Sequence, residues 1–260
     1  MSMTLTIIGC TGSMSGPHSP ASCYLLQTQE TREDGTTRTW NIALEMGPGA
    51  FGQLWRVIDP ADLDAVIFSH CHADHMGDVI SLHVHRRWGP GRGCGTLLLA
   101  GSEQLPERVR QIDGCDPAET YTDEFEFYRM RPGVPFNVGP LTITPSTAQH
   151  TVEAFGVRIE DEGGATMFFT GDTDQCDTII EGARGVDLLL SEAGFTEADA
   201  TRGIHMSGVR AGEVATQAGV RRVVLTHIQP WTPVDTVMSE LRQTWQGEAQ
   251  IAHAGDVFEI

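Results

Sequence analysis

The sequence predicts an α/β fold in which two packed β-sheets lie between outer layers of helices, a four-layer αββα sandwich. Short apolar runs, many of them rich in β-branched residues, alternate along the chain with segments of helical periodicity. Several of these runs end directly at a histidine or a carboxylate, which is where open α/β sheets carry their functional groups. No linker or change of composition divides the chain, so residues 1–260 are expected to form a single domain.

The first half of the chain contains a hairpin followed by alternating helices and strands. Strands are expected at residues 5–9, 22–28, 38–44, 65–68 and 96–100, and helices at residues 50–58, 79–88 and 103–112. The second and third of these strands alternate in polarity and form the hairpin. The glycine-rich segment 9–13 lacks the Gly-Lys-Ser/Thr ending of a phosphate-binding loop, and no helical pattern follows it, so a tight turn is predicted there.

The second half of the chain is rich in strands. Residues 125–159 alternate between strand-like runs and breaks at proline and glycine, and the run at 141–147 leads to His150. Further strands are expected at residues 166–170, 186–190 and 222–225, and a helix at residues 207–218 with Gly219 at its C-terminal cap.

The composition is that of an ordinary globular protein, with 40% hydrophobic residues among 260. The formal net charge of −18 disfavours extensive binding to nucleic acid or to anionic membranes, because affinity for a polyanion depends largely on phosphate neutralisation. The N-terminus has no signal-peptide pattern, no 18-residue apolar stretch occurs, and the six cysteines are scattered without a Cys-x-x-Cys pair. We therefore expect a cytoplasmic protein with reduced thiols and no membrane partner.

Four potential metal ligands occur within six residues, directly after the apolar run 65–68. His70, His72, Asp74 and His75 form the pattern His-x-His-x-Asp-His. A single histidine is more often structural, but four such residues in the loop after a buried strand are typical of a metal site. On a turn, the first two side chains can share one ion while the last two face a second.

Further potential ligands follow later strands, at His150, Asp172 and His227. Each of them alone would more often be structural, but with the cluster they supply five imidazoles and two carboxylates. That set suits two divalent ions, with zinc the first choice and manganese or iron as alternatives, and a bridging carboxylate would hold the ions about 3.5–4 Å apart. His83 and His85 lie two residues apart in an expected helix, point in different directions, and are interpreted as structural or surface residues.

The order of these residues resembles the metallo-β-lactamase superfamily over nearly the whole chain. The shared features are the His-x-His-x-Asp-His pattern, a later histidine, a Gly-Asp-Thr segment and a late Thr-His pair. The resemblance implies these ligand sets: His70, His72 and His150 for one ion, Asp74, His75 and His227 for the other, and Asp172 as the bridge. Where the superfamily usually has the aspartate of an Asp-x-Gly turn, this chain has Glu45, which is one methylene longer and is left outside the ligand set.

Two further segments resemble the ribonuclease Z-like group of that superfamily, which hydrolyses phosphodiesters. They are Ser191-Glu192-Ala193-Gly194-Phe195 and His205-Met206-Ser207. The resemblance implies that Glu192 orients His205 and that His205 contacts the scissile phosphate or the leaving oxygen. The candidate catalytic residues are His205 and Glu192, together with the proposed metal ligand Asp74. Taken alone, His205 also fits an ordinary loop histidine and Glu192 a helix-capping carboxylate.

Within that group, segments 9–22 and 217–231 look most similar to bacterial cyclic-nucleotide phosphodiesterases. This resemblance implies a dinuclear-metal phosphodiesterase acting on a small cyclic nucleotide such as cyclic AMP. One alternative is a transfer-RNA 3′-end processing endoribonuclease, and another is a metal-binding scaffold without turnover. Thioester, lactone or β-lactam hydrolysis also fits the metals but gives no role to His205.

The spacing of the ligands separates these alternatives. Transfer-RNA processing relatives insert a long arm between the third histidine and the bridging aspartate, whereas His150 and Asp172 are only 22 positions apart here. The high negative charge also disfavours a large polyanionic substrate, and a scaffold has no need of His205 and Glu192. A small nucleotide is thus the expected partner, RNA is disfavoured, and a homodimer is one oligomeric state that the sequence leaves open.

Overall fold

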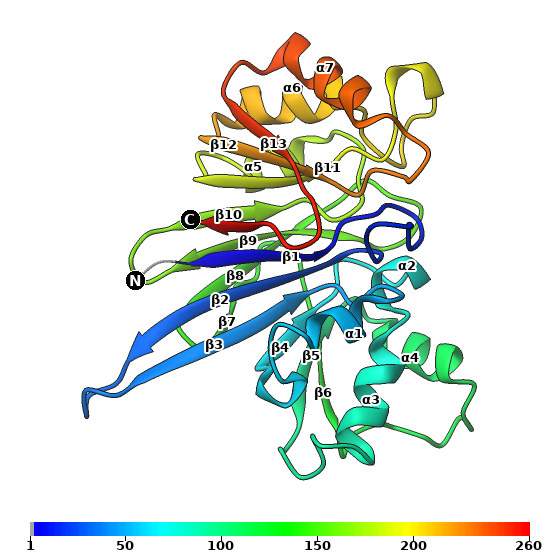
Figure 1. Cartoon of the computed structure of the whole chain (residues 1–260), viewed down its shortest axis with the longest axis vertical. Helices are drawn as coiled ribbons and strands as arrows, with labels where there is room; N and C mark the ends of the chain where they lie inside the picture. Colours follow the sequence, from blue (N-terminus) through cyan, green and yellow to red (C-terminus); the bar gives the residue numbers. More distant parts are fainter. Residues whose placement is uncertain (1–2) are drawn as a thin grey trace.

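The computed structural model describes residues 3–260 and consists of two seven-stranded mixed sheets with helices on both outer faces (Figure 1). The predicted αββα sandwich is therefore confirmed.

The first sheet has the strand order β14-β1-β2-β3-β4-β5-β6. Its strands are β1 (Thr4–Gly9), β2 (Cys23–Thr31), β3 (Thr37–Leu44), β4 (Ala65–Ile67), β5 (Leu97–Gly101), β6 (Phe125–Arg129) and β14 (Val257–Glu259). Strands β3 to β6 are parallel, and the remaining pairs are antiparallel. The short strand β4 is apolar and buried throughout, as expected for a parallel strand that is covered on both faces.

The second sheet has the strand order β13-β12-β11-β10-β9-β8-β7. Its strands are β7 (Phe136–Val138), β8 (Leu141–Thr147), β9 (Phe155–Asp161), β10 (Thr166–Phe169), β11 (Leu188–Glu192), β12 (Arg222–Thr226) and β13 (Glu248–Ile251). Strands β10 to β13 are parallel, so their carboxyl ends meet at one edge of the sheet.

Helices cover the outer face of each sheet. Those of the first sheet are α1 (Ala50–Leu54), α2 (Ala73–Met76), α3 (Val79–Arg87) and α4 (Leu105–Asp113), and those of the second are α5 (Asp177–Gly182), α6 (Gly208–Ala218) and α7 (Val234–Thr244). Short 3₁₀ helices occur at η1 (Pro60–Asp62) and η2 (Glu197–Asp199).

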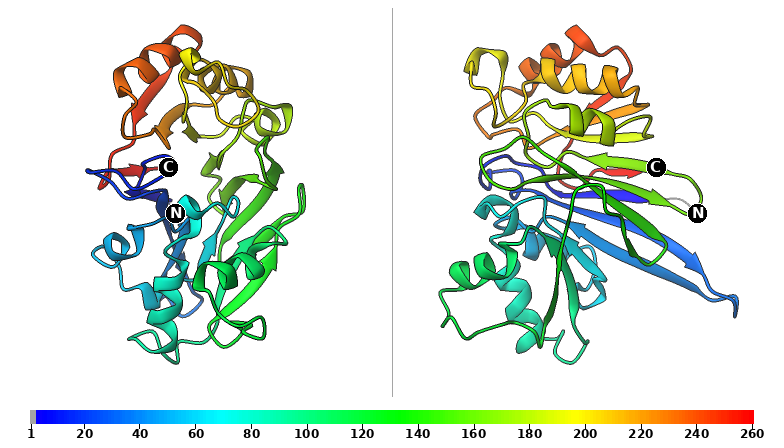
Figure 2. Two further views of the ribbon diagram at one scale, coloured as in Figure 1. Left: turned by 90° about the vertical axis from the view of Figure 1, so that its right-hand side faces the viewer. Right: turned by 180° about the vertical axis from the view of Figure 1, so that it is seen from behind.

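Three apolar clusters define the four layers. The inner cluster joins the two sheets and includes Ile42 of β3 and Leu190 of β11, both fully buried. A second cluster packs Val79 of α3 against Val66 of β4, and a third packs Val214 of α6 against the outer face of the second sheet. The sheets are therefore held face to face by hydrophobic burial, and their loop-bearing edges are brought together on one side of the molecule. That side carries α2 at the right of Figure 1 and faces the viewer in the left panel of Figure 2.

Most of the predicted elements are confirmed, but several boundaries are shifted, as two examples show. The helix expected at 50–58 ends at Leu54 and continues as turns, because the chain must leave helical geometry before Pro60. The strand expected to end before Glu192 instead includes it, since Glu192 pairs with Thr226 of β12. Helices α2, α5 and α7 and strands β13 and β14 were not predicted, and Asp74 and His75, expected in a loop, lie in α2. In residues 3–260, no helix is both long enough and apolar enough to cross a bilayer.

Candidate metal centre

The first three predicted ligands converge on one point at the edge of the sandwich. His70 follows β4, His72 caps α2, and His150 follows β8 from the opposite sheet. Nε2 of His70 lies 2.9 Å from Nδ1 of His72, which lies 3.1 Å from Nε2 of His150. Three imidazole nitrogens from two sheets therefore face one another.

The remaining predicted ligands form a second group beside the first. Nε2 of His75 lies 3.2 Å from Asp74 Oδ2 and 3.1 Å from Asp172 Oδ2, and Asp172 Oδ2 lies 3.3 Å from Nε2 of His227. Within each group the ligand atoms lie within 4.8 Å of one another. The same Asp172 oxygen lies 3.8 Å from Nε2 of His70, so this carboxylate stands between the two groups.

The chemistry of the donor set fits two divalent cations. Ligand atoms about 2.0–2.1 Å from one zinc ion lie roughly 3.3 Å apart in a tetrahedron, close to the separations found here. The outward nitrogens of three rings are fixed by oxygens: His70 Nδ1 by Ser69 Oγ at 2.9 Å, His150 Nδ1 by the Ile204 carbonyl at 2.9 Å, and His227 Nδ1 by Ser22 Oγ at 3.1 Å. Such partners orient a metal-binding imidazole and leave its Nε2 lone pair free. Nε2 of His227 is buried and has no hydrogen-bond partner within residues 3–260, as expected of a ligand atom facing a cation.

The electrostatics of the two groups differ. Burial lowers the pKa of His70 well below its ordinary value and so favours the neutral form that binds metals. Burial also acts to lower the pKa of His75, but the carboxylates of Asp172 and Glu45 outweigh it and raise that pKa well above the usual range. Burial likewise acts to raise the pKa of Asp172, but the neighbouring imidazoles His227 and His75 bring it well below normal. The second group therefore favours positive charge at its centre, whether from a proton or from a cation.

Glu45, which the sequence analysis left outside the ligand set, is fully buried behind His75. Its Oε1 accepts a hydrogen bond from the Ser69 amide at 3.0 Å and lies 3.5 Å from Nδ1 of His75. The longer glutamate side chain thus reaches the outer nitrogen of a predicted ligand without entering the ligand set. This is the orienting role that outer carboxylates have in metal sites.

Two non-glycine residues of the site have left-handed backbone conformations. Glu45 has φ +67° and His227 has φ +56°. Such conformations are costly for residues with a Cβ and cluster at functional sites, where the surrounding structure enforces them. Gly12 helps to enforce the position of His227, because a Cβ at residue 12 would lie 2.2 Å from the His227 carbonyl oxygen.

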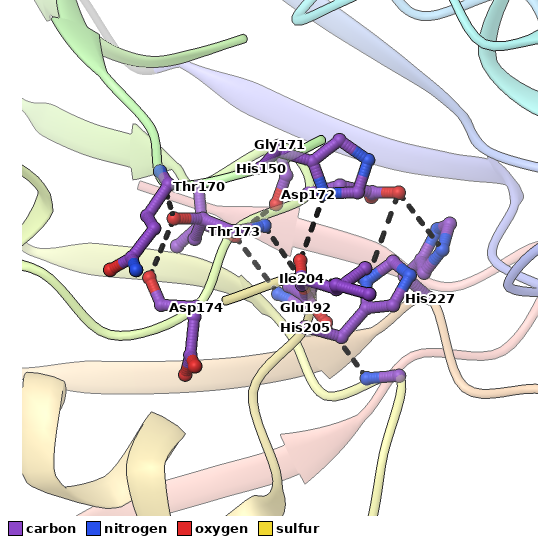
Figure 3. A network of polar contacts seen from close by, with 12 residues as sticks. His150, Thr170, Gly171, Asp172, Thr173, Asp174, Glu192, Ile204, His205 and His227 are labelled. Carbon is purple, nitrogen blue, oxygen red and sulfur yellow. Dashed lines mark hydrogen bonds and ion pairs between the residues drawn. The ribbon is translucent and has the colours of Figure 1, made fainter. Parts of the chain in front are cut away.

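The predicted pair His205 and Glu192 lies beside the ligands His150, Asp172 and His227 (Figure 3). Nδ1 of His205 lies 2.9 Å from Glu192 Oε1 and 3.9 Å from Asp172 Oδ2. Glu192 also accepts hydrogen bonds from the amides of Thr173 at 2.7 Å and Gly194 at 2.8 Å, so it is a fixed strand-end carboxylate and not a helix cap. Burial acts to lower the pKa of His205, but Glu192 outweighs it and raises the pKa to about 9. Nε2 of His205 has no hydrogen-bond partner among the described residues, so it remains free to meet a substrate.

All nine predicted site residues therefore converge in space. His83 and His85 lie elsewhere, in α3, and both are buried, so they are structural and not surface residues.

Comparison with known proteins agrees with this geometry. The family model described as the β-lactamase superfamily domain matches residues 41–228. The chain belongs to the metallo-β-lactamase superfamily. The uncharacterized protein Rv1339 of Mycobacterium tuberculosis is 38% identical over 269 residues, covering 100% of this chain and 93% of that protein. The probable metallo-hydrolase YhfI of Bacillus subtilis is 30% identical over 260 residues, covering 99% of this chain and 100% of that protein.

Solved structures of metallo-β-lactamase fold proteins also match the chain over its whole length. The crystal structure of Bacillus subtilis YhfI has a TM-score of 0.85 and 29% identity, with full coverage of both chains. A long-form RNase Z from yeast has a TM-score of 0.76 at 16% identity, covering 99% of this chain and 42% of that one. Yeast PDE1 has a TM-score of 0.75 at 14% identity, covering 100% of this chain and 99% of that one. These last two similarities concern the fold.

Proposed function

We propose that this metallo-β-lactamase superfamily chain is a dinuclear-metal phosphodiesterase that hydrolyses a small cyclic nucleotide, with cyclic AMP as the first candidate. The observation that carries the proposal is the His205–Glu192 pair, 2.9 Å apart and placed beside both ligand groups. Hydrolysis of an activated ester has no need of such a pair, because its leaving group is a stable anion that departs without an external proton. Hydrolysis of an alkyl phosphodiester does need one.

The two ligand groups would hold the metal ions. We assign His70, His72 and His150 to one ion, Asp74, His75 and His227 to the other, and the bridge to Asp172. Zinc is the first choice for this donor set, with manganese or iron as alternatives. Bound there, divalent ions supply Lewis-acid activation of water and neutralisation of charge on the phosphoryl oxygens.

The chain's own residues complete the site. Glu192 accepts a hydrogen bond from Nδ1–H of His205 and stabilises the doubly protonated imidazolium. The Nε2–H of that imidazolium would give its proton to the leaving ribose oxygen, which then departs as an alcohol. Asp74 is the most exposed carboxylate of its group, with 17% of its side chain accessible, and we assign to it the contact with the attacking water.

The fold between His150 and Asp172 supports a small substrate. This segment consists of β9 and β10 joined by the short connection 162–165, and it holds no protruding arm. The formal net charge of −18 also disfavours the many phosphate contacts that a transfer RNA would require.

A hydrolysis assay tests the proposal. Metal-loaded protein is given cyclic AMP, cyclic GMP, bis-(p-nitrophenyl) phosphate or a precursor transfer RNA, and an Asp172→Ala variant purified in parallel controls for contaminating enzymes. We expect turnover of a cyclic mononucleotide that exceeds transfer-RNA cleavage by orders of magnitude. Efficient, site-specific transfer-RNA cleavage at physiological salt would favour the endoribonuclease alternative, and turnover of none of these substrates would refute phosphodiester hydrolysis.

A further inference from the structure

A buried ion pair lies directly behind the proposed catalytic pair. Asp174, which is 5% exposed, follows the Asp172 turn, and Arg210, which is 6% exposed, projects from the first turn of α6. Nη1 of Arg210 donates a hydrogen bond to Oδ1 of Asp174, and the amide of Gln175 donates to the same oxygen at 2.8 Å. The carboxylate is thus held from two sides, far from solvent.

The second oxygen of Asp174 holds the segment that carries His205. Oδ2 accepts a hydrogen bond from the Gly203 amide at 2.5 Å. The next residue, Ile204, offers its carbonyl to Nδ1 of His150 at 2.9 Å, and the residue after that is His205 itself. Three consecutive residues therefore contact the ion pair, a proposed metal ligand and the proposed catalytic carboxylate in turn.

The other end of the pair is anchored to the same segment. Nε of Arg210 donates to Ser207 Oγ at 3.3 Å and lies 3.5 Å from Glu197 Oε1, and Ser207 donates to that glutamate. The segment 197–207 is thereby held at both of its ends by Arg210 of α6 and at Gly203 by Asp174. Residues 197–202 are largely exposed, so the apolar core gives this stretch little independent support.

Asp174 also connects to the strand that delivers His150. Its amide donates to the Gln149 carbonyl at 2.8 Å, and Thr173 Oγ1 accepts from the Gln149 amide at 2.9 Å. The turn after β10 and the end of β8 are therefore joined at the point where each provides a proposed ligand (Figure 3).

We infer that Asp174 and Arg210 are positioning residues for this site. They hold segment 203–206 so that the Ile204 carbonyl orients His150 for the first ion and His205 meets Glu192. The inference rests on the proposed function for the role of His205, but its effect on His150 does not depend on the substrate.

The test compares Asp174→Asn, Arg210→Met and the double variant with Asp161→Asn. Asp161 is a matched control, since it is 7% exposed and accepts the Ala165 amide at 2.8 Å in the turn between β9 and β10, at the far end of the strands. The Asp174→Asn change keeps the size of the side chain but turns an amide NH₂ group toward either Gly203 or Arg210. Arg210→Lys is a milder second variant, which keeps the charge but loses the planar fork.

Three readouts are measured: hydrogen exchange of peptide 197–206 in metal-free protein, metal affinity by chelator competition, and hydrolysis rates. We expect amide exchange in that peptide to be roughly tenfold faster or more, as for loss of a hydrogen bond to a charged group. Metal affinity should fall about 10–100-fold, as for loss of other groups that orient ligands. The double variant should lose little more than either single variant, because both remove one interaction.

The outcomes separate the inference from the proposed function. In one outcome, the Asp174→Asn and Arg210→Met variants match Asp161→Asn in hydrogen exchange and metal affinity and lose only thermal stability. That result would mean that the Asp174–Arg210 pair has a purely structural role, and it would overturn the inference. If the variants lose metal affinity and exchange protection but the wild-type protein has no phosphodiesterase activity, the positioning role of Asp174 and Arg210 is supported and the proposed function is refuted.

Discussion

Substitution of His205 by alanine tests the assignment that decides the chemistry. The variant should fold, because Glu192 keeps its hydrogen bonds from the amides of Thr173 and Gly194 after the imidazole is lost. It should also keep its metals, because Nδ1 of His205 is directed at Glu192 and every proposed ligand retains its own partners. The loss is therefore expected in the rate alone.

The size of that loss depends on the leaving group. A positioned general acid contributes about 10²–10⁴ in rate, which corresponds to about 3–5 kcal/mol in the activation free energy. Hydrolysis of a cyclic nucleotide expels a ribose alkoxide and should lose the full amount. Hydrolysis of bis-(p-nitrophenyl) phosphate expels a stable phenolate, which departs without a proton, and should lose at most about tenfold.

The assay measures kcat and KM for both substrates with wild-type protein, His205→Ala and His83→Ala, together with metal content. His83 of α3 is 3% exposed and packs edge-on against Tyr121, so the His83→Ala change removes a buried imidazole away from the site. We expect that control to lower the melting temperature but not to change the ratio of the two rates. Equal losses on both substrates for His205→Ala would mean that His205 binds the phosphate and does not act as the acid. No loss on either substrate would remove it from the mechanism.

Two further variants test the ligand geometry. Asp172→Ala should reduce the metal content from about two equivalents to one or fewer, because it removes the only carboxylate within residues 3–260 that lies between both ligand groups. Full metal occupancy of this variant by elemental analysis would contradict the assignment of Asp172 as the bridging ligand. Gly12→Ala should displace His227, whose carbonyl lies 2.2 Å from the position of the new Cβ, and should weaken metal binding about 10–100-fold by chelator competition. Its control is Gly52→Ala, where the new Cβ meets open space within α1, so helix propensity should raise stability by up to about 1 kcal/mol and leave metal affinity unchanged.

The position of the site was predictable from sequence because its ligands follow short buried strands. Parallel strands of one sheet, such as β10, β11 and β12, have their carboxyl ends at a common edge, so residues that follow them converge whatever their separation along the chain. Strand β4 ends at the corresponding edge of the first sheet, which packs beside it. His150 illustrates the same rule for an antiparallel strand, since β8 ends at that edge too. Strand ends therefore marked His70 and His227 as candidates, and the resemblance to the superfamily joined them in one site across the two sheets.

The groups that orient the ligands were not predictable in the same way. Glu45 follows β3 and carried a strand-end signal, but its reach to His75 depends on a left-handed backbone and on one extra methylene. Arg210 lies within a helix, where an arginine is usually solvent-exposed, and its pairing with Asp174 across 36 residues depends on how α6 packs on the second sheet. The Ile204 carbonyl has no sequence signal, because every residue has a carbonyl group.

The division of the site between the two sheets links metal binding to the packing of the fold. His70, His72, Asp74 and His75 come from the first sheet, whereas the later ligands come from the second, and an apolar cluster joins the two. That cluster can hold the sheets together by burial of Ile42 and Leu190, but burial is non-directional and does not fix ligand atoms to within tenths of an ångström.

Directional contacts at the edge must therefore set the final register between the sheets. Phe155 donates its amide to the Ser69 carbonyl at 2.9 Å, one residue before His70, and so ties a strand of the second sheet to the loop that bears the cluster. An ion shared by both sheets would add a further constraint of the same kind, and because it would bind only the assembled edge, its binding free energy would stabilise the native packing.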